Sequence, residues 1–278
     1  MNRSERSMNV MAYVILILGS FIMLAPFVWT VSTAFKTQDH VFDLPPKWIP
    51  DPFTWNNFAE VWNKAPLLTG FMNSAIIAIS VLSVGLFVSA MAAYAFSKFN
   101  FPFKETIFMC LLGTMMIPYS VVMIPQFIGF SYLNWVDTLL PLIVPGLFGH
   151  IVTIFFFKQF MQGGIPSDLI DAAKIDGASY FRTFTTVALP IVKPAIAAQA
   201  ALGFMGIWND FLGPVIYLHS TEKQTIQVII ASLQSNYISQ ANYPNMMAAS
   251  LIALLPVVLV FFFCQRYFIE SLSISGLK

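Results

Sequence analysis

The chain has 278 residues, of which 58% are hydrophobic and only 10% are charged, and its formal net charge is +1. A soluble domain usually carries about a quarter charged residues. This composition therefore excludes an ordinary water-soluble protein and points to lipid as the main solvent. The nearly neutral charge balance gives no indication of a nucleic-acid partner.

Long uncharged runs predict membrane-spanning helices. A helix needs about 20 apolar residues to cross the hydrocarbon layer, whereas barrel strands would be about ten residues long with alternating polarity. The runs here are longer and apolar on every side. We therefore predict an all-α integral membrane protein, a single domain over residues 1–278 with six transmembrane helices. The predicted spans are residues 10–34, 70–97, 106–130, 138–158, 191–216 and 246–266.

The first span is expected to stay in the protein, because its apolar run is longer than the roughly 7–15 residues of a signal peptide. Its orientation follows from the basic residues. With a cytoplasmic N-terminus, ten Lys and Arg residues fall in inner segments and four in outer ones, which agrees with the positive-inside rule. Both termini and the loop at residues 161–190 are then predicted to face the cytoplasm.

Two outer loops interrupt the apolar pattern. The first, residues 36–66, carries Trp48, Trp55 and Trp62, and tryptophan favours the headgroup level of a membrane. The second, residues 218–244, is far longer than an ordinary connection of about 4–6 residues. It is expected to touch a partner or to fold back into a pore mouth.

Small residues recur every four positions in the second span, which places them on one helix face. Such faces let helices approach closely in lipid, and the neighbour is either another helix of this chain or a second subunit. Prolines inside several spans favour kinks. They either line a path or reflect the ordinary abundance of proline in membrane helices. The small residues are Gly85, Ser89, Ala93 and Ser97.

The segment "DLIDAAKIDGASYFRTFTTVALP", residues 168–190, is charged although apolar spans lie on both sides of it. Ser167 or Asp168 is expected to cap a helix N-terminus, and Gly177 to end the helix in a left-handed turn. A helix of about nine residues is marginal alone in water. We therefore expect its apolar face to be buried against another protein. That face is predicted to hold Leu169, Ala172 and Ala173.

This segment resembles the cytoplasmic loop of permease subunits in binding-protein-dependent ABC importers. The consensus of that loop is Glu-Ala-Ala, three residues, Gly, nine residues, Ile, any residue, Leu-Pro, and here Asp replaces Glu and Val replaces Ile. The stretches "AAYAFSKFNFPFKETIF", "MMIPYSVVMIP" and "GIWNDFLGP" are similar to the sugar branch of the family, in the maltose-type subunit with six spans. The matching loop positions are Asp171, Ala172, Ala173, Gly177, Val187, Leu189 and Pro190.

The resemblance implies a bacterial cytoplasmic-membrane importer in which the short helix is a coupling helix seated in an ATP-binding subunit. It implies a second, homologous permease as heterodimer partner, two ATP-binding subunits and an extracytoplasmic sugar-binding protein. No G-x-x-x-x-G-K-[ST] phosphate loop occurs in the sequence, so the chain is not expected to bind ATP by that route. We expect no cofactor in this chain and no enzyme activity, with ATP and Mg used by the partner ATPase.

A few polar residues in or near the spans are candidates for the translocation pathway. Asp210 is the lone acid within a span, which makes it a functional candidate, although its place near the outer interface also suits a helix cap. His150 is expected to be hydrogen-bonded within the bundle, and Cys110 and Cys264 show no metal or disulfide spacing. The predicted pathway residues are Asn209, Asp210, Asn73 and Gln126.

Two other classes of function stay open. A self-sufficient secondary transporter or channel would favour paired intramembrane charges or broken-helix repeats, and a membrane-embedded enzyme would need a nucleophile with a base or a metal cluster. The sequence shows neither pattern. A neutral mono- or oligosaccharide is the expected substrate, because no basic residue lies in the interior of a span to meet an anion. Glycerol phosphate or an acidic oligosaccharide remains an alternative, since the partner permease can hold the binding residues.

Overall fold

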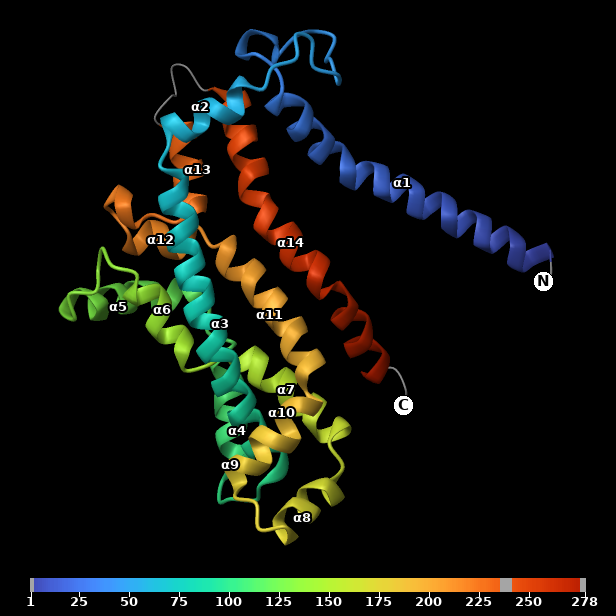
Figure 1. Ribbon diagram of the computed structural model, residues 1–278, viewed down its shortest axis with the longest axis vertical. Coiled ribbons are helices and arrows are strands. Elements are labelled where there is room, and N and C mark those ends of the chain that lie inside the picture. The colour runs from blue at the N-terminus through green and yellow to red at the C-terminus, as the bar shows by residue number, and fades with distance from the viewer. Residues whose placement is uncertain (1–2, 236–241, 276–278) are drawn as a thin grey trace. The chain divides into compact units, whose positions relative to one another are not determined.

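The computed structural model describes residues 3–235 and 242–275, and every regular element in these ranges is helical (Figure 1). The predicted all-α fold is thus confirmed for the described residues. They divide into two compact units, one drawn from residues 1–67 and 229–255, the other from residues 68–228 and 256–278. Part of the predicted outer loop 218–244, residues 236–241, lies outside the described residues.

Four helical segments are long and apolar enough to cross a membrane, and they coincide with four predicted spans. Their limits are Met11–Ala34, Leu67–Lys98, Leu140–Gly164 and Tyr243–Arg266. They belong to α1 (Arg3–Ala34), α3 (Leu67–Lys98), α6 (Leu140–Leu147) followed by α7 (Ile151–Gly164), and α14 (Tyr243–Ser275).

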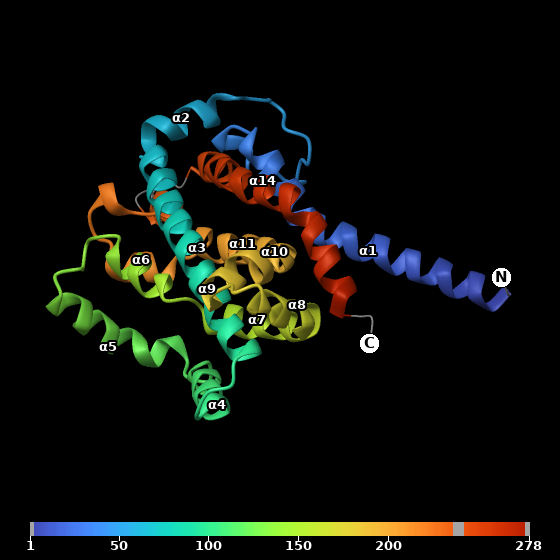
Figure 2. The same cartoon turned by 60° about the horizontal axis from the view of Figure 1, so that its bottom comes forward.

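The predicted span 106–130 is not one straight helix. It consists of α4 (Lys104–Thr114) and α5 (Tyr119–Tyr132), which meet at an angle of 93°, and Figure 2 shows the two helices diverging. At about 1.5 Å per residue, α4 reaches only about 16 Å, roughly half of the hydrocarbon thickness. Pro118 stands directly before α5 in an extended conformation. Proline has no backbone N–H, so it cannot continue the hydrogen-bond ladder of a preceding helix.

The predicted span 191–216 is also divided. The helical segment Tyr180–Ile191 meets α11 (Lys193–Trp208) at 76°, and a second break after Trp208 separates α11 from α12 (Leu212–Tyr217). The described residues therefore contain four candidate spans, or up to six if each bent pair is one span. The count of six stays a prediction.

The first unit contains α1, a loop with the short helix η1 (Gln38–His40), α2 (Asn56–Lys64) and the start of α14. The loop is closed onto the end of α1 by Asn57, whose side-chain amide donates to the carbonyls of Ala34 and Lys36 at 2.8 Å each. The ammonium of Lys36 is buried over the ring of Trp29, 4.2 Å from its centroid. These contacts fix the loop that follows α1.

In the second unit, the small-residue face of α3 packs against α6 and the start of α7. A Cβ on Gly85 would lie 2.5 Å from the carbonyl oxygen of Gly146, so the two backbones are in direct contact. One turn further, the Ser89 hydroxyl accepts the backbone N–H of His150 at 3.1 Å. Ala93 follows, fully buried. The small-residue face therefore packs against other helices of this chain, which is the first of the two predicted neighbours, rather than against a second subunit.

A carboxylate joins two loops at one end of this unit. Asp137, which follows α5, accepts the backbone N–H groups of His219 and Ser220 at 2.9 and 2.8 Å and the hydroxyl of Ser220. Its own N–H donates to the carbonyl of Tyr217 at 2.8 Å. These hydrogen bonds, those of Ser220 foremost, lower the pKa of Asp137 from 3.8 to about 2. We call this set of hydrogen bonds between Asp137 and residues 217–220 the Asp137 clasp. It holds the end of α12 in place.

We expect Gly85→Ala to lower the thermal stability of the purified protein, because the new methyl group must push α6 away and overpacking typically costs about 1–3 kcal/mol. Gly129→Ala is the matched control, since a Cβ at this site in α5 meets no atom within 4 Å and alanine favours the helix. Tryptophan fluorescence during heating in detergent measures both. Equal midpoints for the two variants would contradict the close packing.

Asp137→Ala should destabilise the protein at neutral pH, with Glu222→Ala as an exposed control. Because the pKa of Asp137 in the folded chain lies below its ordinary value, its contribution is present above about pH 4 and disappears as the pH falls through 2. Melting curves at pH 7, 5 and 3 should show a constant difference between wild type and variant at the first two values and a smaller one at the third. A difference that grows on acidification would refute the clasp.

Candidate functional site

The charged segment forms α8 (Ser167–Ile175), a helix of nine residues as predicted. Gly177 has a positive φ of 76°, and the N–H groups of Gly177 and Ala178 donate to the carbonyls of Lys174 and Ala173. This pattern is a Schellman motif, in which glycine takes the left-handed position without a Cβ penalty. The predicted helix end is therefore confirmed.

The predicted N-cap is wrong. Ser167 is the first helical residue, Pro166 precedes it in an extended conformation, and no side chain caps the helix. Proline has no N–H and a fixed φ, so it marks this start through its geometry rather than through a hydrogen bond. Asp168 still lies in the first turn, where a negative charge suits the positive end of the helix dipole.

The face of α8 that is buried within this chain is not the face that was predicted to contact another protein. Ile170 is the buried residue, with 4% of its surface exposed, while Leu169 and Ile175 are 46% and 87% exposed. Ala172 is exposed and Ala173 is half-buried. The helix is apolar on two sides, so one side is anchored inside this chain and the other faces outward.

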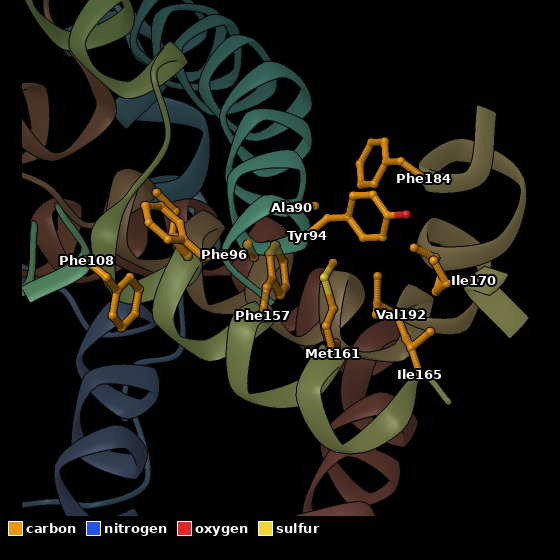
Figure 3. Close-up of a cluster of buried hydrophobic side chains, with 14 residues drawn as sticks. Ala90, Tyr94, Phe96, Phe108, Phe157, Met161, Ile165, Ile170, Phe184 and Val192 are labelled. Carbon is orange, nitrogen blue, oxygen red and sulfur yellow. The ribbon is translucent and has the colours of Figure 1, made fainter. Parts of the chain in front are cut away.

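The inward anchor belongs to a buried core that joins α8 to α3, α7 and the helices after it. Figure 3 shows Ile170 near Tyr94 of α3 and Phe184, whose rings lie 5.4 Å apart. Lys98, at the end of α3, donates to the carbonyl of Ile165 just before α8 at 2.6 Å. The hydroxyl of Tyr94 is buried there without a hydrogen-bond partner among the described residues.

The second half of the matched motif continues this core. It lies in α9 (Tyr180–Thr183), a π-helical turn at Phe184–Ala188 and α10 (Leu189–Ile191). Val187 and Leu189 pack against the core, whereas Pro190 is exposed. In the first half, Asp171 is exposed and accepts a hydrogen bond from Lys174 at 2.9 Å. An exposed pair of this kind contributes little to stability.

A cavity of about 430 Å³ lies within the second unit, next to the middle of α3 at Val81. Its wall comes from α3, α5, α6, the residue before α7, α11, α12 and the break before α12. The volume falls within the range of small-molecule sites, about 300–1,000 Å³. The lining residues that carry polar groups are Tyr119, Gln126, His150, Asp210 and Tyr217.

Two of the four predicted pathway residues, Asp210 and Gln126, meet at this cavity. Asp210 lies in the break between α11 and α12, and its carboxylate accepts the N–H of Gly213 at 3.3 Å, so it also caps α12. Sequence reasoning missed the tyrosines of the wall. Their hydroxyls lie 3.4 Å apart although Tyr119 is in α5 and Tyr217 in α12, and no local pattern pairs such distant positions.

The other two predicted pathway residues do not line the cavity. Asn73 donates to the carbonyls of Glu222 and Gln224 at 2.9 Å each and so holds the loop around η3 (Thr221–Lys223) against α3. Asn209 donates to the carbonyl of Met205 and accepts from Gln227, at the start of α13 (Ile226–Ser235). Both side chains have structural partners.

Residues 85–274 match the family described as "Binding-protein-dependent transport system inner membrane component". The chain is 35% identical over 230 residues to an arabinooligosaccharides transport system permease protein of Halalkalibacterium halodurans, which covers 82% of this chain and 81% of the relative. It is 31% identical to a diacetylchitobiose uptake system permease protein of Streptomyces coelicolor, over 97% and 89% of the two chains.

A third relative is the sn-glycerol-3-phosphate transport system permease protein of Yersinia enterocolitica, 30% identical over 98% of both chains. Among solved structures, a chain of a bacterial ABC transporter involved in the import of the acidic polysaccharide alginate superimposes with a TM-score of 0.85 at 20% identity. The match covers 96% of this chain and 99% of that one. This likeness establishes a shared fold.

The all-helical fold, the apolar spans and the match over most of the chain agree with one another. The chain belongs to the inner membrane permease components of binding-protein-dependent ABC importers.

Proposed function

We propose that the chain is one half of the pore of an ATP-driven importer for a neutral sugar or oligosaccharide. A second, homologous permease forms the other half, two ATP-binding subunits drive the cycle, and an extracytoplasmic binding protein delivers the sugar. The relatives named for arabinooligosaccharides and diacetylchitobiose support a carbohydrate substrate. An anionic substrate is the alternative, because another relative is named for sn-glycerol-3-phosphate.

The outward face of α8 is the observation that carries the coupling role. Leu169, Ala172 and Ile175 are exposed on a nine-residue helix, and exposed apolar surface of this kind marks an interaction site. Ile170 anchors the opposite side in the core next to α3. We assign to Asp171, Ala172, Ala173 and Gly177 the contact with an ATP-binding subunit, and to Val187, Leu189 and Pro190 the support of that contact.

In this proposal the chain has six spans, with both termini and α8 in the cytoplasm of a bacterial cell. ATP and Mg are bound and used by the partner ATPase, and this chain holds no cofactor. The cavity near α12 is part of the translocation pathway, with Gln126 and Asp210 among its walls. Asn73 and Asn209 support that end of the chain through their hydrogen bonds.

Ala172→Asp should abolish co-purification of the ATP-binding subunit from mild detergent while the second permease is retained. The added carboxylate lies on the exposed face of α8, so it spoils docking without entering the core. Gln162→Asp, an exposed position near the end of α7, is the matched charge control. Retention of the ATPase by Ala172→Asp at the wild-type level would exclude this face as the docking surface.

The substrate class is tested by uptake of labelled sugars into the native bacterium with and without this gene. We expect uptake of at least one of arabinotriose, N,N′-diacetylchitobiose or lactose to be lost on deletion and restored by the gene on a plasmid. Glycerol 3-phosphate and an alginate trisaccharide serve as the anionic probes. Loss of uptake confined to these anions would replace the neutral-sugar proposal by the anionic alternative.

A further inference from the structure

The cavity between α3, α5, α6 and α12 has one aromatic wall. The rings of Phe130 and Tyr217 meet edge to face with centroids 5.4 Å apart, and the hydroxyls of Tyr119 and Tyr217 lie 3.4 Å apart. All three residues line the cavity. Packing therefore holds the aromatic surface in place before a ligand arrives, and such a surface suits the C–H face of a sugar ring.

The remaining polar lining is built for hydroxyl groups. Gln126 presents both a donor and an acceptor, and the imidazole of His150 can present either. Neither side chain has a hydrogen-bond partner among the described residues. A ligand with many hydroxyls can donate to and accept from both. Aromatic wall and unpartnered polar groups together favour a carbohydrate over an apolar ligand.

The acidic group in the cavity is the carboxyl group of Asp210, and its position is fixed. The N–H of Gly213 holds the carboxylate of Asp210, and a Cβ at Gly213 would lie 2.7 Å from the other carboxylate oxygen, so that oxygen lies close against the glycine. No Lys or Arg is among the described residues that line the cavity. A uronate or phosphate would therefore meet a like charge without a cation to offset it, and charge repulsion is strong where water is partly excluded.

We infer that this chain carries its own sugar subsite in the cavity, formed by Tyr119, Gln126, Phe130, His150, Asp210 and Tyr217. The subsite takes a short neutral carbohydrate and rejects anionic ones through the Asp210 carboxylate. This inference rests on the proposed function and deepens it, because it places substrate contacts in this permease and assigns the choice between neutral and anionic substrates to one residue.

The test uses the complete importer, purified without its binding protein and placed in lipid nanodiscs, so that the binding protein cannot select the sugar. Saturation-transfer NMR then measures direct contact with arabinotriose, N,N′-diacetylchitobiose or lactose, whichever the cells import, and with an alginate trisaccharide as the anionic probe. The wild-type importer should give signals with the neutral sugar and none above background with the anionic one.

Gln126→Leu removes the amide but keeps similar bulk, and we expect about a tenfold weaker affinity for the neutral probe, as for the loss of a good hydrogen bond. Asp210→Asn keeps an oxygen that can cap α12 and removes only the charge. It should gain binding of the alginate trisaccharide, because a uronate would no longer meet a like charge. Glu222 is an exposed carboxylate outside the cavity, so Glu222→Gln is the matched charge control. It should change the binding of neither probe.

The outcomes separate this inference from the proposed function. If cells import none of the neutral sugars, the proposed substrate class fails before the NMR experiment. If cells import a neutral sugar but the wild-type importer gives no signal with it, or Gln126→Leu binds it as wild type does, the subsite is overturned while the importer function stands. Equal binding of the anionic probe by wild type and Asp210→Asn would overturn the charge selection.

Discussion

The contact between the backbones of α3 and α6 is the constraint on which the second unit depends. In a membrane, a helix gains no hydrophobic energy when it exchanges contact with lipid tails for contact with another apolar helix. Close packing must therefore hold the helices together. Gly85 provides this by letting α3 touch the carbonyl of Gly146. The Ser89–His150 hydrogen bond then fixes α3 against the start of α7.

Both candidate functional regions use the same helix. Near the middle of α3, Val81 lines the cavity together with Gly146 and His150. Near the C-terminal end of α3, Tyr94 belongs to the core that holds Ile170 of α8. A single helix thus forms part of the cavity wall and part of the support of α8. Its small residues are as necessary as its large ones, because they set the distance to α6 and α7.

Hydropathy predicted the membrane segments and the all-α fold because burial in lipid imposes a composition that a sequence shows directly. Gly177 also predicted the end of α8, since its left-handed turn needs no tertiary information. The angles of 93° and 76° between paired helices could not be predicted in the same way. A proline removes a hydrogen bond, but neighbouring packing sets how far the chain then turns.

The site was predicted only in part, for a related reason. Asp210 and Gln126 stood out because polar groups are rare in such a chain, whereas Tyr119 and Tyr217 did not, because aromatic residues are common in it. Their pairing depends on α5 and α12 being brought together. The side of α8 that the chain itself covers, at Ile170, was not predicted, because both sides of the helix are apolar and periodicity alone does not distinguish them.

The two apolar sides of α8 have a consequence for the life of the protein before assembly. A copy without partners shows Leu169 and Ile175 to water, on a helix too short to be stable by itself. Chaperones and proteases act on exposed apolar segments that open easily. The face that we assign to docking would therefore also mark an unassembled copy for removal. The amount of this chain in the membrane would then follow the supply of its partners rather than its own rate of synthesis.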